Sequence, residues 1–147
     1  MTILTHKFVT FIPSKKDLED DVLYISLDSG TVIHKCCCGC GNEVVTPLSP
    51  TDWNLTFDGE TISLYPSIGN WSFKCQSHYW IKNSKVIKAG YLPKSEIEKG
   101  RRYDIYTKQK YFKNKKKEEP SKIKASKSKL NWWSGFMGFL KHLNETF

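Results

Sequence analysis

All five cysteines of the chain occur in two short segments, and this distribution limits how the chain can fold. The first segment reads HKCCCGCG over residues 34–41, and the second reads CQSHYW from Cys75. An odd number of cysteines, three of them consecutive, is a poor disulfide framework, but such grouped thiols are typical of a metal site in a reducing compartment. We therefore expect a cytoplasmic protein in which both segments meet around one structural zinc ion.

The preferred zinc ligands are four of the five thiols: Cys36, Cys38, Cys40 and Cys75. Residues two apart on a straight strand are separated by about 6.6 Å, which is too far for sulfurs that each approach zinc to about 2.3 Å. The chain must therefore curl, and Gly39 and Gly41 allow it to do so. Cys37 is the odd thiol. Two alternatives remain: His34 replaces Cys36, or the thiols are buried without a metal.

The rest of the sequence predicts a mainly antiparallel β domain over residues 1–112. Residues 22–27 and 31–35 are rich in β-branched and apolar residues and flank the turn sequence Asp28-Ser29-Gly30. These two runs predict a hairpin that leads the chain directly into the first cysteine segment.

A second hairpin is indicated by alternation on both sides of Asp58-Gly59. Residues 53–57 and 60–64 place their apolar side chains on one face if a two-residue turn pairs Phe57 with Glu60. The sequence therefore predicts a tight turn at this position.

The later part of the domain is predicted to hold a third hairpin and a helix. Residues 71–81 and 85–87 flank a turn at Asn83-Ser84. Residues 93–100 predict a short helix, and residues 103–106 predict a last edge strand. The small α+β domain would end after this strand.

The net charge of +8 belongs to one segment of the chain. Residues 108–129 contain ten lysines and two glutamates, whereas the other 13 basic and 13 acidic residues balance one another. A neutral core makes nucleic acid an unexpected partner.

We predict a lysine-rich linker over residues 113–129 and an amphipathic helix over residues 130–147. This helix is expected to pack on the domain or on a partner protein, and contact with an anionic membrane is the less favoured alternative. We expect a soluble protein that is not exported, because no stretch has the length and apolar character of a membrane span or a signal peptide.

A serine and a histidine near the cysteines form a candidate reaction centre. Pro66 is expected to end a strand and Gly69 to permit a tight turn, which would expose the Ser67 hydroxyl and align the following N–H groups as an oxyanion site. His78 follows Cys75 by three residues and would be held by the metal site. A histidine within reach of a serine hydroxyl is the minimum for nucleophilic acyl transfer.

Residues of the same types offer alternatives for each role. His34 is a candidate for orienting the other histidine or for acting as the base itself, and Asp58 is a candidate orienter. Ser63 or Ser77 could replace the nucleophile. Serines at turns and single histidines are more often structural, which favours a noncatalytic zinc-ribbon-like module that docks a protein or nucleic acid. A metal hydrolase is a third possibility, with an open zinc site formed by His34, His78 and one or two cysteines.

Four motifs together resemble a known bacterial family: HKCCCGCG, TPLSPTDW, DGETISLYPSIGNW and CQSHYWI. The chain resembles the BubE-like peptidases, long described as a domain of unknown function and encoded in Bub-type ubiquitin-like conjugation operons. The resemblance implies a serine peptidase with a zinc-stabilised β domain that processes a ubiquitin-like protein and removes it from targets. It also implies activating- and conjugating-enzyme homologues as further partners. The resemblance implies that Ser67 is the nucleophile and His78 the base. It also implies that the metal ligands are Cys36, Cys38, Cys40 and Cys75. Cys37 stands where family members often have proline or another residue.

Overall fold

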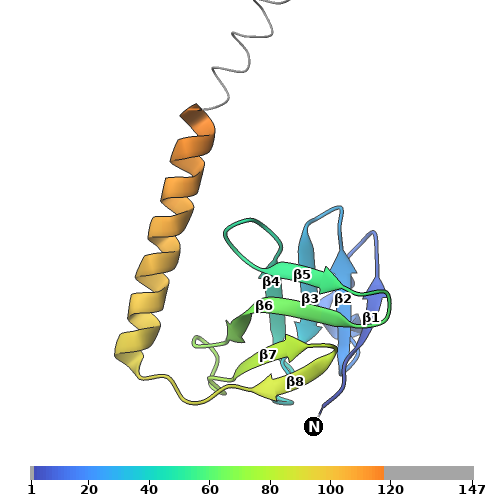
Figure 1. The fold of residues 1–147 in the computed structure, drawn as a ribbon. Coiled ribbons are helices and arrows are strands. Elements are labelled where there is room, and N and C mark those ends of the chain that lie inside the picture. Colours follow the sequence, from blue (N-terminus) through green and yellow to red (C-terminus); the bar gives the residue numbers. More distant parts are fainter. Residues whose placement is uncertain (1, 118–147) are drawn as a thin grey trace, which may run out of the picture. The chain divides into compact units, whose positions relative to one another are not determined.

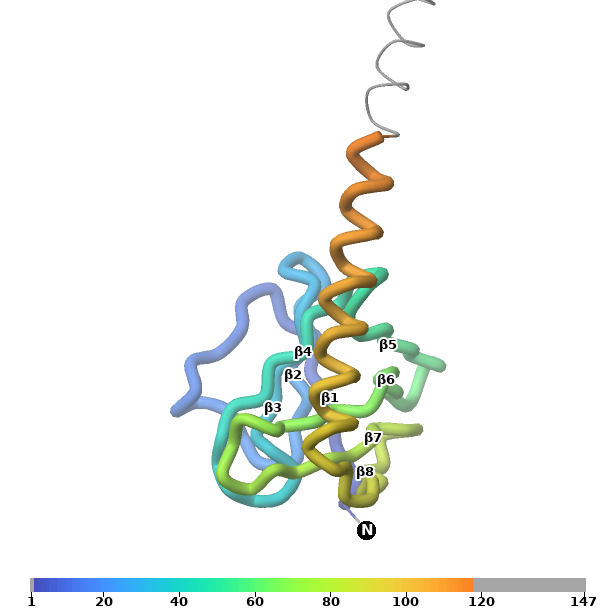
Figure 2. Tube along the Cα trace, turned by 90° about the vertical axis from the view of Figure 1, so that its left-hand side faces the viewer, coloured from blue at the N-terminus to red at the C-terminus, as the bar shows by residue number. Residues whose placement is uncertain are grey.

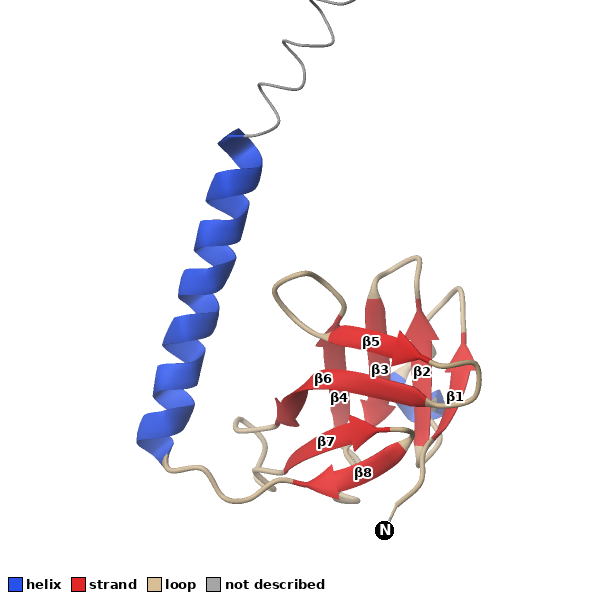
Figure 3. Ribbon diagram, in the orientation of Figure 1, coloured by secondary structure: helices blue, strands red, loops and turns tan. Residues whose placement is uncertain are grey.

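The computed structural model describes residues 2–117, and this part of the chain contains eight strands, a 3-10 helix and one long helix. The elements follow one another in this order: β1 (Thr5–Phe8), η1 (Lys15–Asp17), β2 (Val22–Ser26), β3 (Thr31–Lys35), β4 (Glu43–Pro47), β5 (Asn54–Phe57), β6 (Ile62–Gly69), β7 (His78–Lys82), β8 (Lys85–Lys88) and a helix over residues 94–117. Residues up to Arg101 form one compact unit, and Arg102 begins a second. The predicted mainly β domain is confirmed, and Figure 3 shows its strands in red.

The strands form two four-stranded sheets, β1-β2-β3-β4 and β5-β6-β7-β8, with neighbours in chain order. All pairs are antiparallel except β1 with β2, which is parallel. The strands of one sheet cross those of the other (Figure 1). Isolated bridges join Ile3 to Lys85 and Leu48 to Trp53, so both edges of one sheet meet edges of the other. Such closure protects edge strands from pairing with other chains.

The main core lies between the two sheets and is built from alternate residues of the strands. Leu23, Ile25 and Val32 come from the first sheet, Ile62 and Ile81 come from the second, and all are at most 1 % exposed. Burial of such side chains contributes about 1.5–3 kcal/mol each. The alternation of apolar residues along the strands therefore gives each sheet an apolar face, and these two faces pack against each other.

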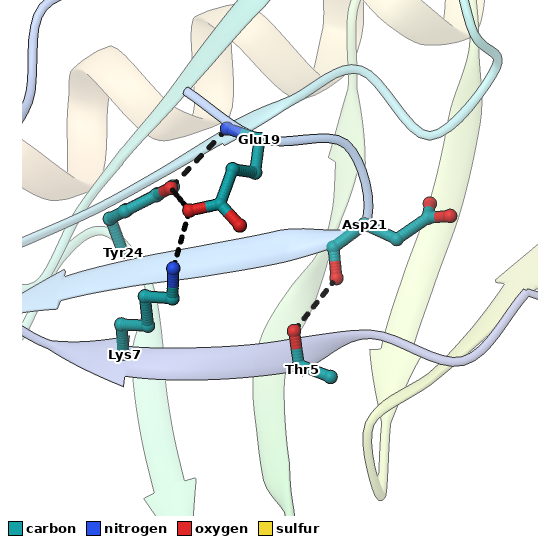
Figure 4. Close-up of polar contacts among 5 residues, drawn as sticks. All are labelled: Thr5, Lys7, Glu19, Asp21 and Tyr24. Carbon is teal, nitrogen blue, oxygen red and sulfur yellow. Dashed lines mark hydrogen bonds and ion pairs between the residues drawn. The ribbon is translucent and has the colours of Figure 1, made fainter. Parts of the chain in front are cut away.

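The segment between β1 and β2 covers the outer face of the first sheet. Its apolar residues Val9, Ile12 and Leu18 pack in a second cluster with Val22 and Tyr24 of β2 and Ile33 of β3. Figure 4 shows the polar contacts that hold the segment in place. The Glu19 carboxylate pairs with Lys7 and accepts a hydrogen bond from the Tyr24 hydroxyl at 2.9 Å, while the Thr5 hydroxyl donates to the Asp21 carbonyl at 3.5 Å. This covering explains why every residue of β2 is buried.

The hairpin of β5 and β6 has a longer turn than predicted. Phe57 pairs with Ile62 and not with Glu60, so the predicted two-residue turn is wrong. The Asp58 carboxylate accepts hydrogen bonds from the backbone N–H of Glu60 and from the N–H and hydroxyl of Thr61, and these contacts stabilise a four-residue loop. The register differs by two residues, which leaves the predicted faces of both strands unchanged.

Strand β6 continues through Pro66, contrary to the expectation that this residue ends it. The register between β6 and β7 shifts between Leu64 and Ile68, which marks a bulge. Proline has no N–H to donate to the ladder, and a bulge is one of the few places where a central strand tolerates it. Ser67 therefore lies within a bulged strand and not in the predicted turn.

The predicted short helix continues to residue 117, so the predicted edge strand over residues 103–106 is wrong. Between Pro93 and Pro120 no proline interrupts the helical pattern, and Lys, Glu, Gln and Arg are good helix formers. An ion pair three residues apart, Glu96 with Lys99 at 2.7 Å, adds support on its surface.

Residues 118–147 lie outside the part of the chain that the structure describes. Most of the predicted linker over residues 113–129 and the whole predicted helix over residues 130–147 are in this region and remain predictions. Among residues 2–117, no helix has the length and apolar character needed to cross a membrane.

Candidate metal centre and active site

The loop after β3 and the loop before β7 lie side by side (Figures 1 and 2). In the first loop Gly39 and Gly41 have φ values of +84° and +72°, a region that favours glycine. The Cys36 N–H donates to the Asn42 carbonyl at 2.8 Å, and the Gly39 N–H donates to the Cys36 carbonyl at 3.0 Å. The chain thus curls back on itself, as the spacing of the cysteines requires.

The two loops bring four thiols together, and their Sγ atoms all lie within 4.8 Å of one another: Cys36, Cys38, Cys40 and Cys75. The Sγ of Cys36 is 3.4 Å from that of Cys38 and 4.0 Å from that of Cys75. The sulfurs of Cys40 and Cys75 are 3.7 Å apart. Ligands at about 2.3 Å from zinc in a tetrahedron would be separated by about 3.8 Å. All five cysteines are free thiols, so this group can bind a metal ion without reduction of a disulfide.

Polar side chains surround the buried end of this cysteine cluster. The Ser77 hydroxyl lies 3.0 Å from the Sγ of Cys36 and 3.6 Å from that of Cys75, and the Asn70 amide nitrogen lies 3.6 Å from Cys36 Sγ. Desolvation raises the pKa of Cys75, but hydrogen bonds from the Ser77 side chain and backbone help to lower it to about 6. These donors favour the thiolate form, which is the form that binds a metal ion.

Cys37 and His34 do not belong to the four-thiol group. Cys37 packs against the core, and burial raises the pKa of its thiol to about 11. His34 is 1 % exposed, its Nε2 lies 2.9 Å from the Tyr79 hydroxyl, and burial lowers its pKa to about 4. A neutral imidazole therefore lies in the core beside Tyr79, and among the described residues its Nδ1 has no hydrogen-bond partner.

The side chains of Ser67 and His78 meet between neighbouring strands of the second sheet. Pairing of Gly69 with His78 brings β6 alongside the start of β7, and His78 Nε2 lies 3.0 Å from Ser67 Oγ. His78 Nδ1 lies 3.3 Å from the Gly90 carbonyl oxygen. Because a carbonyl only accepts, the neutral imidazole carries its proton on Nδ1 and leaves Nε2 free to accept the serine hydroxyl.

Two tryptophans flank the His78 ring. The Trp71 and Trp80 rings lie with centroids 4.9 Å and 5.8 Å from it. A Cβ added to Gly69 would lie 2.4 Å from Trp71 Nε1, so only glycine lets the indole pack at this position. The role of Gly69 is therefore to admit the tryptophan, in place of the tight turn that the sequence predicted.

The other candidates from the sequence have different partners. Ser63 lies at the next hairpin, where its Oγ accepts a hydrogen bond from the Asn83 N–H at 2.9 Å. Ser77 contacts the cysteine cluster. Asp58 is engaged within its own hairpin loop, away from any histidine contact among the described residues. Of the three candidate serines, Ser67 is the one hydrogen-bonded to a histidine.

Sequence reasoning missed the Gly90 carbonyl and a pocket of about 490 Å³ next to His78. A backbone acceptor leaves no trace in residue identity, so the orienting group could not be found among side chains. The tryptophans did leave a signal, since Trp71 follows the GN pair after Ser67 and Trp80 follows His78 by two residues.

Comparison with known proteins shows the family to which the chain belongs. The family model described as "Bacterial ubiquitination-like system serine protease (BubE)" matches residues 8–89, which is more than half of the chain. Searches among curated proteins and among solved structures gave no significant match. The matched segment contains every cysteine and the Ser67–His78 pair. The chain therefore belongs to the BubE family of serine proteases of bacterial ubiquitination-like systems.

Proposed function

We propose that the protein is a cytoplasmic serine peptidase that cleaves after the C-terminus of a bacterial ubiquitin-like protein, both in a precursor and in conjugates with target proteins. The observation that carries the proposal is the contact of 3.0 Å between Ser67 Oγ and His78 Nε2, together with the Gly90 carbonyl behind the ring. Membership of the BubE family supports the reaction class and the ubiquitin-like partner. Activating- and conjugating-enzyme homologues would supply the conjugates.

In the proposed reaction, His78 Nε2 takes the hydroxyl proton while Ser67 Oγ attacks the carbonyl carbon of the scissile amide. The C–N bond then breaks, His78 returns the proton to the departing amine, and an ester joins the substrate to Ser67. Water, deprotonated by the same imidazole, attacks this ester and restores the serine. Throughout the reaction the Gly90 carbonyl accepts a hydrogen bond from Nδ1–H. This contact stabilises the imidazolium that forms in each half-reaction.

The four-cysteine cluster is proposed to hold zinc as a structural ion. Its sulfur spacing fits a tetrahedral ion, and four thiolates would leave no open position for water. When bound, zinc cross-links the loop after β3 to the loop before β7. Cys75 precedes His78 by three residues, so this cross-link would hold the start of the strand that carries the base.

The test is cleavage of a ubiquitin-like precursor that carries a C-terminal extension, followed by mass spectrometry. We expect Ser67→Ala and His78→Gln to abolish cleavage with full zinc content, because both groups take part in proton transfer. Ser63→Ala is the matched control, since this serine lies on the same strand without a histidine partner. An ester on Ser67, trapped with an active-site acylating reagent, would locate the nucleophile.

Other outcomes would favour the competing functions. Unchanged cleavage by Ser67→Ala would refute the serine mechanism. Loss of cleavage when a chelator removes the metal from a domain that stays folded would favour a metal hydrolase. Binding of the ubiquitin-like protein without any cleavage would favour a noncatalytic module.

A further inference from the structure

We propose that the pocket beside His78 binds the departing segment of the substrate and selects a carboxylate in that segment. This inference rests on the proposed peptidase function and adds a specificity site to it. The pocket has a volume of about 490 Å³, enough for a few peptide residues, and its wall includes His78, Trp71 and Gly90.

The position of the pocket relative to the reacting groups indicates which part of the substrate it receives. His78 lines the pocket, but Ser67 does not. During acyl transfer the acyl part stays bonded to the serine, whereas the departing nitrogen receives its proton from the histidine. The departing segment of the substrate lies next to the imidazole that protonates it, and this imidazole lines the pocket. The pocket therefore receives the residues after the scissile bond.

The chemistry of the wall indicates what this segment carries. One face of the helix start lines the pocket with residues three or four apart: Lys94, Ile97, Glu98 and Arg101. Two cations face one carboxylate, and no ion pair engages Lys94 or Arg101 within residues 2–117. Glu98 disfavours a second anion close to itself, but the pair of cations leaves a net positive charge. Ile97 and Trp71 provide apolar surface for the short chain that bears the anion.

A carboxylate can come from two sources in a departing peptide: an Asp or Glu side chain, or the C-terminus of a short extension. Both present the same planar anion to a guanidinium and an ammonium group. Lys94 and Arg101 are exposed, so solvent weakens each contact. We expect each cation to contribute about a fivefold preference, which corresponds to about 1 kcal/mol.

The experiment compares kcat/KM of the full-length protein on matched precursors of a ubiquitin-like protein. One has a Glu in a short extension, one has Gln at that position, and each is made with a free or an amidated C-terminus. A fifth substrate ends in an aminocoumarin group that is too small to reach the pocket cations. We expect Arg101→Gln and Lys94→Gln to lower kcat/KM about fivefold on the acidic substrates, with little change on the amidated Gln substrate or the coumarin. Lys99→Gln is the control, because Lys99 pairs with Glu96 and does not line the pocket.

Each outcome bears on one of the two proposals. A selective loss on the Glu substrate identifies the side chain as the ligand, and a selective loss on the free C-terminus identifies the terminal carboxylate. Equal losses on all substrates, or no loss on any, would overturn the pocket proposal while cleavage still requires Ser67. Cleavage that persists in Ser67→Ala would instead refute the peptidase mechanism itself.

Discussion

Cys75→Ser is the variant that most directly tests how the fold supports the site. Cys75 is the one member of the cysteine cluster that comes from the loop before β7, while the other three lie between Cys36 and Cys40. Without it, a bound ion no longer links the two loops. Cys40 and Cys75 are separated by 35 positions, and closing a loop of this length is worth about 4 kcal/mol in the chain-entropy model. This is a large share of the roughly 5–15 kcal/mol that stabilises a typical domain.

The measurements are zinc content by atomic spectroscopy and thermal unfolding by circular dichroism. For a domain of this size, a loss of about 4 kcal/mol lowers Tm by roughly 15–30 °C. We expect Cys75→Ser to lose zinc and to melt in that lower range. Cys37→Ser is the control, because this thiol lies outside the cluster, and it should keep its zinc and lose about 1 kcal/mol or less. A Cys75→Ser protein that keeps zinc and melts within about 3 °C of the wild type would refute the reasoning.

Three further predictions follow from single contacts. The pKa of His34 is lowered to about 4, so the unfolded chain binds a proton between pH 6.5 and 4 that the folded chain does not; the stability advantage of wild type over His34→Gln should fall by about 3 kcal/mol over this range, as urea unfolding at each pH would show. Gly69→Ala should displace the Trp71 indole and lower kcat about 100-fold, whereas Gly100→Ala, with open space around its Cβ position, should leave kcat unchanged in the same assay. Asn70→Ala removes a donor to the cysteine cluster and should weaken zinc affinity about tenfold or more in competition with a chelator, and unchanged affinity would contradict this role.

The local pattern predicted the strands well where both turn residues and alternation were present. The β2–β3 hairpin forms as expected around residues 27–30, and Asn83 and Ser84 both have positive φ in the turn that joins β7 to β8. The four-residue loop after Phe57 was not predictable from the Asp-Gly pair, because the Asp58 carboxylate bonds to residues two and three positions ahead. A side chain that caps its own loop competes with the tight turn that the pair favours.

The candidate site was predictable where residue identity reveals it, and not where pairing with a distant strand decides it. Cysteine side chains reveal a metal cluster through their identity alone, and the predicted set Cys36, Cys38, Cys40 and Cys75 does meet. The Ser67–His78 contact was inferred from residue types, but the reason given for it was wrong, since Ser67 lies in a bulged strand and not in a turn. Bulges are set by pairing with a distant strand, which a single segment does not encode.

The structure makes His78 dependent on two constraints that lie outside the proposed catalytic pair. On one side, an ion bound by the cysteine cluster would fix the chain three residues earlier at Cys75; on the other, the ladder pairs His78 with Gly69. A change in either constraint would displace the imidazole and alter its distance of 3.0 Å from Ser67 Oγ, because closely packed side chains transmit such shifts. A ligand variant that still folds should therefore lower kcat more than it raises KM, since proton transfer is sensitive to sub-ångström displacement and substrate binding is less so. Equal effects on kcat and KM would show that the cysteine cluster supports the fold without positioning the base.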